Sequence, residues 1–157
     1  MPGYGLPKGA KGLLPWKWAD DRLKKSHNYW ITTTRPDGRP HQMIVWGLWL
    51  DGVFYFSTGR HSRKSKNLSQ HPHCIVATEE ADHAVILEGL AEETPSVPLR
   101  RKVLGLYERK YKFDMGGMEE DILNLKEPIF AVRPIVAFGL DEKKSLNAAT
   151  RWTFSSR

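Results

Sequence analysis

Small polar residues and cations gather between an aromatic-rich segment and the start of an expected helix, and their types suit them to hold an anion. They are Ser57, Thr58, Gly59, Ser62, Arg63, Lys64, Lys66 and Asn67. A helix N-terminus presents unpaired backbone N–H groups and the positive end of the helix dipole, so cations in its first turn oppose helix stability unless an anion compensates them. We therefore expect a phosphate group here. A solvated basic helix face is the alternative interpretation.

Three strand-like segments joined by two tight turns must position these residues. The segments cover residues 28–34, 40–50 and 53–59. Each is rich in β-branched or aromatic residues, and Asp-Gly pairs at 37–38 and 51–52 separate them. Such pairs tolerate the positive φ angles of hairpin turns. Two hairpins in succession predict a three-stranded meander, whose last strand leads into the helix that begins at Ser62.

The rest of the chain predicts a mainly β protein with short helices. Further helices are expected at residues 16–26, 95–111 and 118–125, and further strands at 73–78, 83–92 and 127–140. The last strand is expected to bend at Pro134, which suits an edge or a bulge. Six strands in all indicate a closed antiparallel barrel, because closure removes exposed sheet edges. Residues 1–15 hold four glycines and three prolines and are expected to form a flexible N-terminal arm, with 16–157 as a single domain.

Composition narrows the class of protein. The chain has 157 residues, of which 40% are hydrophobic, which suffices for one core. No apolar run approaches the ~18 residues of a membrane helix, and the first residues lack the apolar segment of a signal peptide. We therefore expect a cytoplasmic protein that does not bind membranes. The single cysteine, Cys74, lies in an expected strand, which favours a buried structural thiol.

The net charge of +6 favours an anionic partner. Because the cations are scattered, a phosphorylated small molecule fits at least as well as a nucleic acid, and no RNP-like pattern supports RNA binding. The histidines show no metal-ligand spacing, so no metal is expected, although a single strand histidine could serve as an axial haem ligand. Four tryptophans could form an apolar ligand wall: Trp30, Trp46, Trp49 and Trp152. On one regular strand Trp46 and Trp49 face opposite sides, so only one of them can line a pocket.

The segment RPHQMIVWGLWLDGVFYFSTGRHSRKSKNLSQHP resembles the core of the pyridoxamine 5′-phosphate oxidase-like split β-barrel superfamily. The segment AATRWTF resembles the C-terminal signature of its flavin/deazaflavin-dependent oxidoreductase branch. The resemblance runs from Trp16 to Phe154. It implies a six-stranded antiparallel split β-barrel that binds FMN or coenzyme F-420, an 8-hydroxy-5-deazaflavin.

The resemblance also implies where the cofactor binds. Its phosphate would contact Ser62, Arg63 and Lys64, and its ring and ribityl chain would lie along Val45, Trp46, Ser57 and Thr58. The protein would be a homodimer with two shared sites, each completed by Arg151 and Trp152 of the partner subunit. Arg151 is then the candidate for stabilising the reduced ring, with a solvent-exposed arginine as the alternative interpretation. No catalytic residue is expected, since the cofactor ring performs hydride transfer while the protein supplies orientation and a dry pocket.

Two positions depart from the true oxidases, which carry Arg and Lys where this chain has Met43 and Leu48. The departure disfavours pyridoxamine phosphate oxidation itself and favours the deazaflavin over FMN. We therefore expect an oxidoreductase that transfers a hydride between the cofactor and a small conjugated organic acceptor. A flavin- or haem-binding split barrel without turnover is the alternative that the sequence leaves open.

Overall fold

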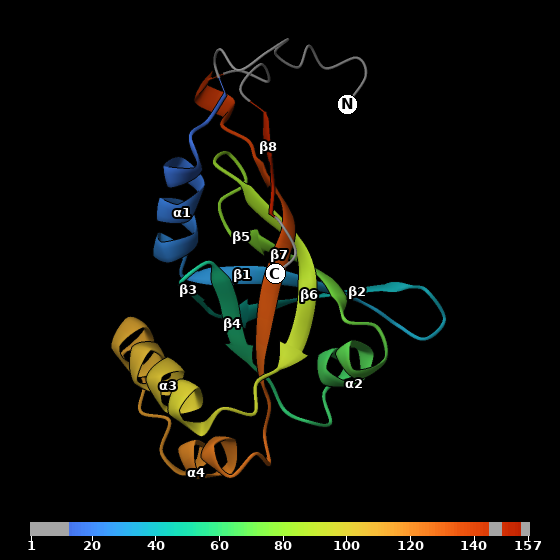
Figure 1. The fold of residues 1–157 in the computed structure, drawn as a ribbon, viewed down its shortest axis with the longest axis vertical. Helices are drawn as coiled ribbons and strands as arrows, with labels where there is room; N and C mark the ends of the chain where they lie inside the picture. Colours follow the sequence, from blue (N-terminus) through green and yellow to red (C-terminus); the bar gives the residue numbers. More distant parts are fainter. Residues whose placement is uncertain (1–12, 145–148, 155–157) are drawn as a thin grey trace.

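In the part of the chain that the computed structural model describes, residues 13–144 and 149–154, eight strands form one curled antiparallel sheet flanked by four α-helices (Figure 1). The strands are β1 (Asn28–Thr34), β2 (Pro40–Trp46), β3 (Leu48–Leu50), β4 (Val53–Ser57), β5 (His73–Thr78), β6 (Val85–Glu93), β7 (Ile129–Gly139) and β8 (Thr150–Thr153). The helices are α1 (Trp16–Lys25), α2 (Arg63–Gln70), α3 (Val97–Tyr111) and α4 (Gly117–Leu123), with a short 3-10 helix, η1 (Glu142–Lys144). The mainly β class with short helices is thus confirmed. The expected N-terminal arm lies almost wholly outside the described residues.

The strand order is β2-β1-β5-β6-β7-β4-β3, and β8 pairs with β7 beside this path. Every pairing is antiparallel. Eight strands replace the six expected from the sequence for two reasons. The segment 40–50 divides into two strands at Gly47, and residues 150–153 form a strand that the sequence analysis did not predict.

The division at Gly47 produces the curl of the sheet. Strands β2 and β3 lie at the two opposite ends of the strand order, although only Gly47 separates them in the chain. A Cβ added at Gly47 would lie 2.1 Å from Cζ of Phe54, so the bend needs a residue without a side chain. Both expected hairpins are present, β1–β2 and β3–β4. The expectation of one meander was wrong, because its middle strand is shared between the two ends of the sheet.

Strand β7 holds the two ends of the molecule together. Along one side it pairs with β6; along the other it pairs first with β4 and then, beyond a gap, with β8. Pro134 falls in this gap, where its missing N–H is not needed, and opposite a register shift between Glu88 and Gly89 in β6. The bend predicted at Pro134 is therefore placed at a bulge, as expected.

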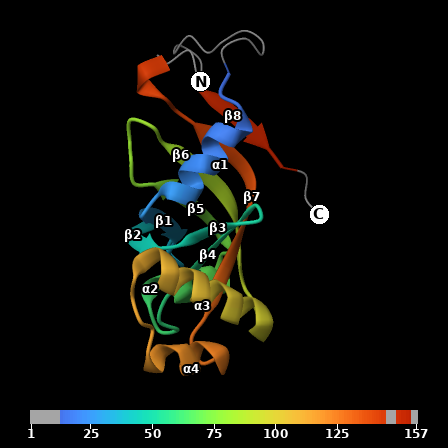
Figure 2. The same ribbon diagram turned by 90° about the vertical axis from the view of Figure 1, so that its left-hand side faces the viewer.

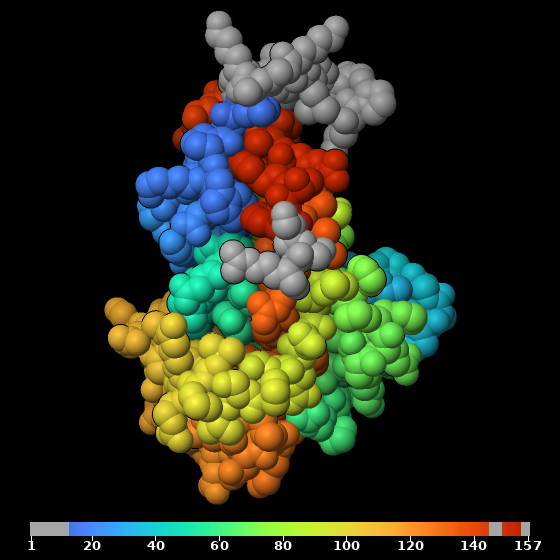
Figure 3. Space-filling view, in the orientation of Figure 1, coloured from blue at the N-terminus to red at the C-terminus, as the bar shows by residue number. Residues whose placement is uncertain are grey.

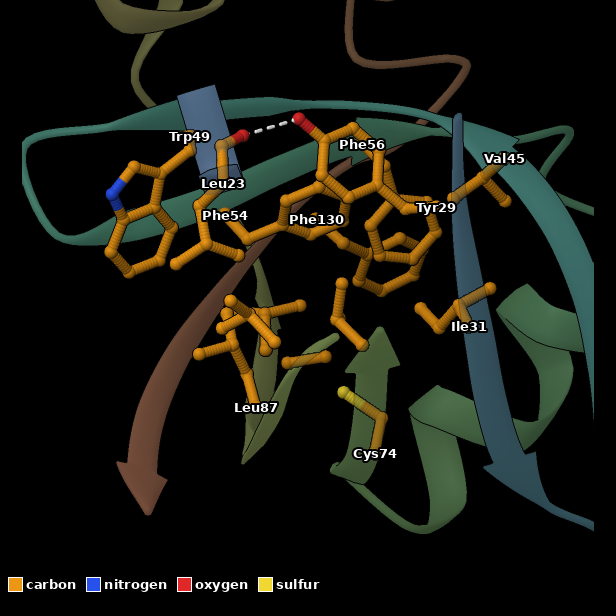
Figure 4. Packing of buried hydrophobic residues seen from close by; sticks show 14 of the residues in the cluster. Leu23, Tyr29, Ile31, Val45, Trp49, Phe54, Phe56, Cys74, Leu87 and Phe130 are labelled. Atoms are coloured by element: carbon orange, nitrogen blue, oxygen red, sulfur yellow. Dashed lines mark hydrogen bonds between the residues drawn. The ribbon is translucent and has the colours of Figure 1, made fainter. Parts of the chain in front are cut away.

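Two hydrophobic clusters stabilise the fold. The larger fills the inside of the curled sheet and includes Tyr29, Phe54 and Phe56, which are fully buried (Figure 4). The Tyr29 hydroxyl donates to the backbone oxygen of Leu23 in α1, 2.5 Å away, which ties that helix to the sheet (Figure 4). The second cluster packs β3, β4 and the start of β7 against α3 and α4. Because β4 is buried on both faces, its sequence is almost continuously apolar.

The helix start at Ser62 and the buried Cys74 agree with what the sequence predicted. Helix α2 begins after Ser62, whose hydroxyl accepts a hydrogen bond from the Ser65 N–H, 3.2 Å away. Cys74 is buried, as expected, and burial raises the pKa of its thiol to about 12. Among the described helices, none is long and apolar enough to span a bilayer.

Candidate functional site

A hollow of about 600 Å³ lies where the ends of β2 and β4 meet α2, α3 and α4. These helices occupy the same end of the molecule, away from β8 (Figure 1, Figure 2, Figure 3). The lining residues are Ile44, Val45, Trp46, Ser57, Thr58, Gly59, Lys64, Tyr107, Phe113, Met115, Met118, Asp121, Ile122 and Glu127. Six of the residues singled out from the sequence are among them: Val45, Trp46, Ser57, Thr58, Gly59 and Lys64. We call this hollow the pocket.

The pocket has a cationic side formed by the start of α2. Lys64 is half-buried there, and burial lowers the pKa of its ammonium group. Among the described residues no side-chain hydrogen bond or ion pair is formed by the Lys64 ammonium, which is unusual for a partly desolvated cation. The hydroxyls of Thr58 and Ser62 lie 3.1 Å apart beside it. This side of the pocket therefore presents the Lys64 charge and the Thr58 hydroxyl, while Ser62, outside the lining, also caps α2.

Two further polar groups converge on the same region from the β1–β2 hairpin. The pKa of His41 is lowered, mainly by burial and further by the positive charges of Arg35, Lys64 and Arg63. Among the described residues, His41 Nδ1 and Arg35 Nε are buried without a hydrogen-bond partner. An anion at this point would relieve the mutual repulsion of the cations and would offer an acceptor to the Arg35 Nε–H.

Arg35 and His41 were not predicted as site residues because their proximity to α2 depends on how the hairpin folds back. One signal was available: on strand β2, alternation places His41 on the same face as Val45. Arg63, which was expected to contact the phosphate, is exposed next to this group rather than in the pocket lining.

The opposite wall of the pocket is aromatic and apolar. The Trp46 ring stacks on Tyr111 with ring centres 4.4 Å apart and planes 8° from parallel. Phe113 contacts Trp46 edge-on, with centres 5.6 Å apart, and Met115 and Met118 continue this wall. The sequence predicted helices at 95–111 and 118–125 but indicated no ligand contact for either, so the part of α3 and α4 in the pocket was missed. Trp49 instead lies in the larger core, so only one of the two β2–β3 tryptophans lines the pocket, as expected.

A buried arginine fixes the loop that carries the small polar residues. The Arg100 side chain is fully buried, and it donates to the backbone oxygens of Thr94, Ile122 and Glu127, each 2.7 Å away. Its guanidinium shares the carboxylate of Glu93 with Arg60, at 2.9 Å from each. Arg60 also donates to the backbone oxygens of Leu125 and Lys126, so it is anchored to the segment that joins α4 to β7. The loop before α2 and the α4 side of the pocket are thus held in a fixed relation.

The structure does not bring the remaining predicted residues into the pocket of the same chain. Asn67 is buried and donates to the Thr33 hydroxyl, 2.9 Å away, so it joins α2 to β1, and Lys66 is exposed. Arg151 and Trp152 lie on β8, at the other end of the molecule from α4 (Figure 1). Arg151 is exposed, whereas the Trp152 ring packs edge-on against Trp16, with centres 5.3 Å apart.

The family model for pyridoxamine 5′-phosphate oxidase matches residues 17–133. A comparison with curated proteins finds no match. Among solved structures, the conserved hypothetical protein Rv2991 from Mycobacterium tuberculosis is 22% identical, with a TM-score of 0.75 over 88% of this chain and 92% of that one. An F-420 reductase is 20% identical, with a TM-score of 0.61 over 75% and 94% of the two chains.

A heme binding protein from Mycobacterium smegmatis is 16% identical, with a TM-score of 0.65 over 90% of this chain and 59% of that one. At identities this low, the structural similarity establishes a shared fold and no more. The match of the family model covers most of the chain, including the strands and helices that form the pocket. The chain therefore belongs to the pyridoxamine 5′-phosphate oxidase family and has its split β-barrel fold.

Proposed function

We propose that the protein binds FMN or coenzyme F-420 in the pocket and transfers a hydride between this cofactor and a small conjugated organic acceptor. The observation that carries the proposal is Lys64, a half-buried cation of the pocket lining with no anionic partner among the described residues. A cofactor phosphate would supply that partner. The F-420 reductase among the structural neighbours supports the choice of cofactor class.

The residues present fit such a cofactor. Lys64, Ser62 and Arg63 would hold the phosphate, together with the unpartnered Arg35 Nε–H and the His41 imidazole, which would donate in the tautomer that carries its proton on Nδ1. Gly59 adds open space, since no atom lies within 4 Å of where its Cβ would be. The side chains of Ser57 and Thr58 would contact the ribityl chain. When bound, the flavin or deazaflavin ring supplies the hydride chemistry itself.

The apolar wall gives the pocket its second role. Val45, Trp46 and Phe113 would lie along the ring and keep water away from it. The two carboxylates of the lining are engaged elsewhere: Glu127 accepts from the Arg60 backbone N–H, and Asp121 pairs with Lys126. An uncharged conjugated acceptor is therefore favoured over a cationic one. Leu48, where true oxidases have a lysine, is buried in the second core and offers no charge to a substrate.

The homodimer with shared sites is part of the proposal. Large apolar side chains that are 38–51% exposed lie on the strands β2, β1, β5, β6 and β7: Ile44, Trp30, Ile75, Leu90 and Ile135. Burial of this sheet face against a second copy would remove them from water. Arg151 and Trp152 of the partner subunit would then reach the cofactor, which the pocket of one chain does not allow. The partner is proposed to be a second copy, not a nucleic acid or a membrane.

The test is a pair of matched double variants. Arg63→Ala with Lys64→Ala should weaken binding of both coenzymes, by about 10- to 100-fold for each charge-assisted bond that is lost. The control is Arg101→Ala with Lys102→Ala, an equally charged neighbouring pair on α3 whose side chains are 66% and 56% exposed. Titrations followed by flavin or deazaflavin fluorescence report the affinity. Equal dissociation constants for the two double variants would refute the phosphate assignment.

Turnover is tested separately from binding. Single-turnover reoxidation of the reduced, bound cofactor with a neutral quinone or enone should be fast compared with the free cofactor. Parental binding without reoxidation would indicate the second candidate, a binding protein without turnover. Haem is included in the titrations because the apolar wall and the heme binding protein among the neighbours support it as an alternative ligand. If haem showed a shift of its Soret band on addition of the protein and neither coenzyme bound, haem would be the ligand in place of the proposed cofactor.

A further inference from the structure

The last turn of α3 holds the chain at the point where it divides between β2 and β3. The Gly47 N–H donates to the Tyr111 hydroxyl, 2.8 Å away. The Gly47 carbonyl accepts from the Lys110 ammonium at 2.8 Å and lies 2.9 Å from the Tyr111 hydroxyl. The Trp46 carbonyl accepts from the Tyr107 hydroxyl at 2.6 Å. Three side chains of one helix turn therefore bind the polar backbone groups at the break.

These contacts act directly on the wall of the pocket. Trp46, which precedes Gly47, lines the pocket and stacks on Tyr111. Because the Tyr107 and Tyr111 contacts fix both the backbone and the ring of Trp46, any movement of the Gly47 peptide changes where this ring lies. The position of the pocket wall thus depends on Lys110 and Tyr111, which do not line the pocket, as well as on Tyr107, which does.

Lys110 is the charged member of this group. Its ammonium also donates to the Tyr29 hydroxyl, 2.9 Å away, and lies 4.7 Å and 5.3 Å from the ring centres of Tyr29 and Tyr111. Burial lowers its pKa to about 8, against a smaller opposing effect of Glu79. Burial raises the pKa values of Tyr29 and Tyr111, so both stay neutral when Lys110 titrates. The ring of His27 packs on Tyr111, and Glu79 follows β5, so these groups complete the titratable surroundings.

We infer that Lys110 is a positioning residue for the pocket, whose charge-assisted bond to the Gly47 carbonyl sets the place of the Trp46 ring and whose loss of charge loosens it. A charge-assisted hydrogen bond is about twice as strong as a neutral one. When Lys110 loses its proton, the break between β2 and β3 is held less firmly, and the aromatic wall moves. The role in cofactor binding rests on the proposed function, whereas the contact between Lys110 and the Trp46 wall does not.

The experiment reads the Trp46 ring directly. The full chain is labelled with 5-fluorotryptophan, and its ¹⁹F NMR spectrum is followed from pH 6 to 10, with Trp46→Phe to assign the Trp46 signal. In the parent, this signal should move with a midpoint near pH 8. In Lys110→Met it should show no transition there. Lys102→Met, which removes a cation from the exposed face of the same helix, should behave like the parent.

A second measurement separates this inference from the proposed function. Cofactor affinity is measured at pH 7 and pH 9.5; it should change several-fold more in the parent than in Lys110→Met, because Lys64, whose pKa is also lowered, is the same in both proteins. If the Trp46 signal depends on Lys110 but neither coenzyme binds the parent, the proposed function fails and the positioning role stands.

A Trp46 signal without a transition near pH 8 in the parent overturns the inference, and this outcome needs no variant to fold. A transition that is the same in Lys110→Met and in the parent overturns it as well. Lys110→Gln, which keeps a donor for the Gly47 carbonyl without a charge, serves if the methionine variant does not fold. It should show no transition near pH 8.

Discussion

Replacement of Gly47 by alanine should be among the most harmful single-methyl additions to this protein. The new Cβ would lie 2.1 Å and 2.4 Å from two atoms of the Phe54 ring. The ring would have to retreat by roughly 1.3 Å to reach a contact distance of about 3.4 Å. Phe54 has no exposed surface and packs on Tyr29 and Phe56, with ring centres 4.7 Å and 6.1 Å away, so it has little room to move.

The expected size follows from the packing. Overfilling a well-packed core costs about 1–3 kcal/mol, and a rigid aromatic neighbour places Gly47→Ala near the upper value. A loss of about 3 kcal/mol lowers the melting temperature of a chain of this size by roughly 6–12 °C. The measurement is urea unfolding followed by circular dichroism. Because Gly47 adjoins Trp46, cofactor affinity should fall as well.

Gly105→Ala is the matched control, since it makes the same change in a different setting. Gly105 lies inside α3, and no atom lies within 4 Å of where its Cβ would be. Alanine there should stabilise the protein by about 0.5–1 kcal/mol, because glycine is a poor helix former. The two variants are thus expected to change the free energy of unfolding in opposite directions. If Gly47→Ala unfolded at the same urea concentration as the parent, the account of the break between β2 and β3 would be refuted.

Four further outcomes are expected. Sedimentation should give twice the chain mass at low micromolar concentration, and a stable monomer there would rule out shared sites. Arg151→Ala should lower coenzyme affinity or hydride transfer in a folded dimer; truncation after Asn147 should do the same but also remove β8 and the Trp152 packing, so the point variant is the cleaner measurement. The pKa of Lys110 is lowered to about 8 from its usual 10.5, so between these pH values the unfolded chain binds more protons than the folded one. The free energy of unfolding should therefore rise with pH in this range in the parent, and Lys110→Met should lack this rise. Cys74 should resist alkylation in the folded protein and react only on unfolding, and fast labelling would contradict its burial.

Local sequence signals predicted the elements of the fold well because each signal acts over a few residues. The Asp51-Gly52 turn has positive φ at both positions, as the hairpin requires, and Ser62 caps α2 through its hydroxyl. The extents of β5 and α3 follow the apolar pattern to within two residues. What the pattern did not show was the break at Gly47, because the aromatic residues on its two sides read as one strand.

The candidate site was predicted on its cationic side and missed on its apolar side for a physical reason. Ser62 and Lys64 lie in one short segment, so their chemistry is visible in the sequence. Tyr107 and Met118 reach the pocket only because α3 and α4 pack beside β4, and an apolar residue of a helix has the same appearance whether it faces a core or a ligand. Asn67 shows the converse error: a polar residue next to the cations proved to be a buried link to Thr33.

The continuity of β2 and β3 through Gly47 has a consequence for aggregation. In an open sheet, the first and last strands each expose a row of backbone groups that can recruit another chain. Here those two edges belong to one segment of the polypeptide, each already paired with its sequence neighbour in a short hairpin. Loop closure over so few residues is inexpensive in entropy, so both hairpins can form before the distant pairings of β6 with β7. A chain cut at Gly47 would keep the same side chains, but its two edge strands would no longer be joined at the bend and each could pair with another chain independently, so its tendency to associate should rise.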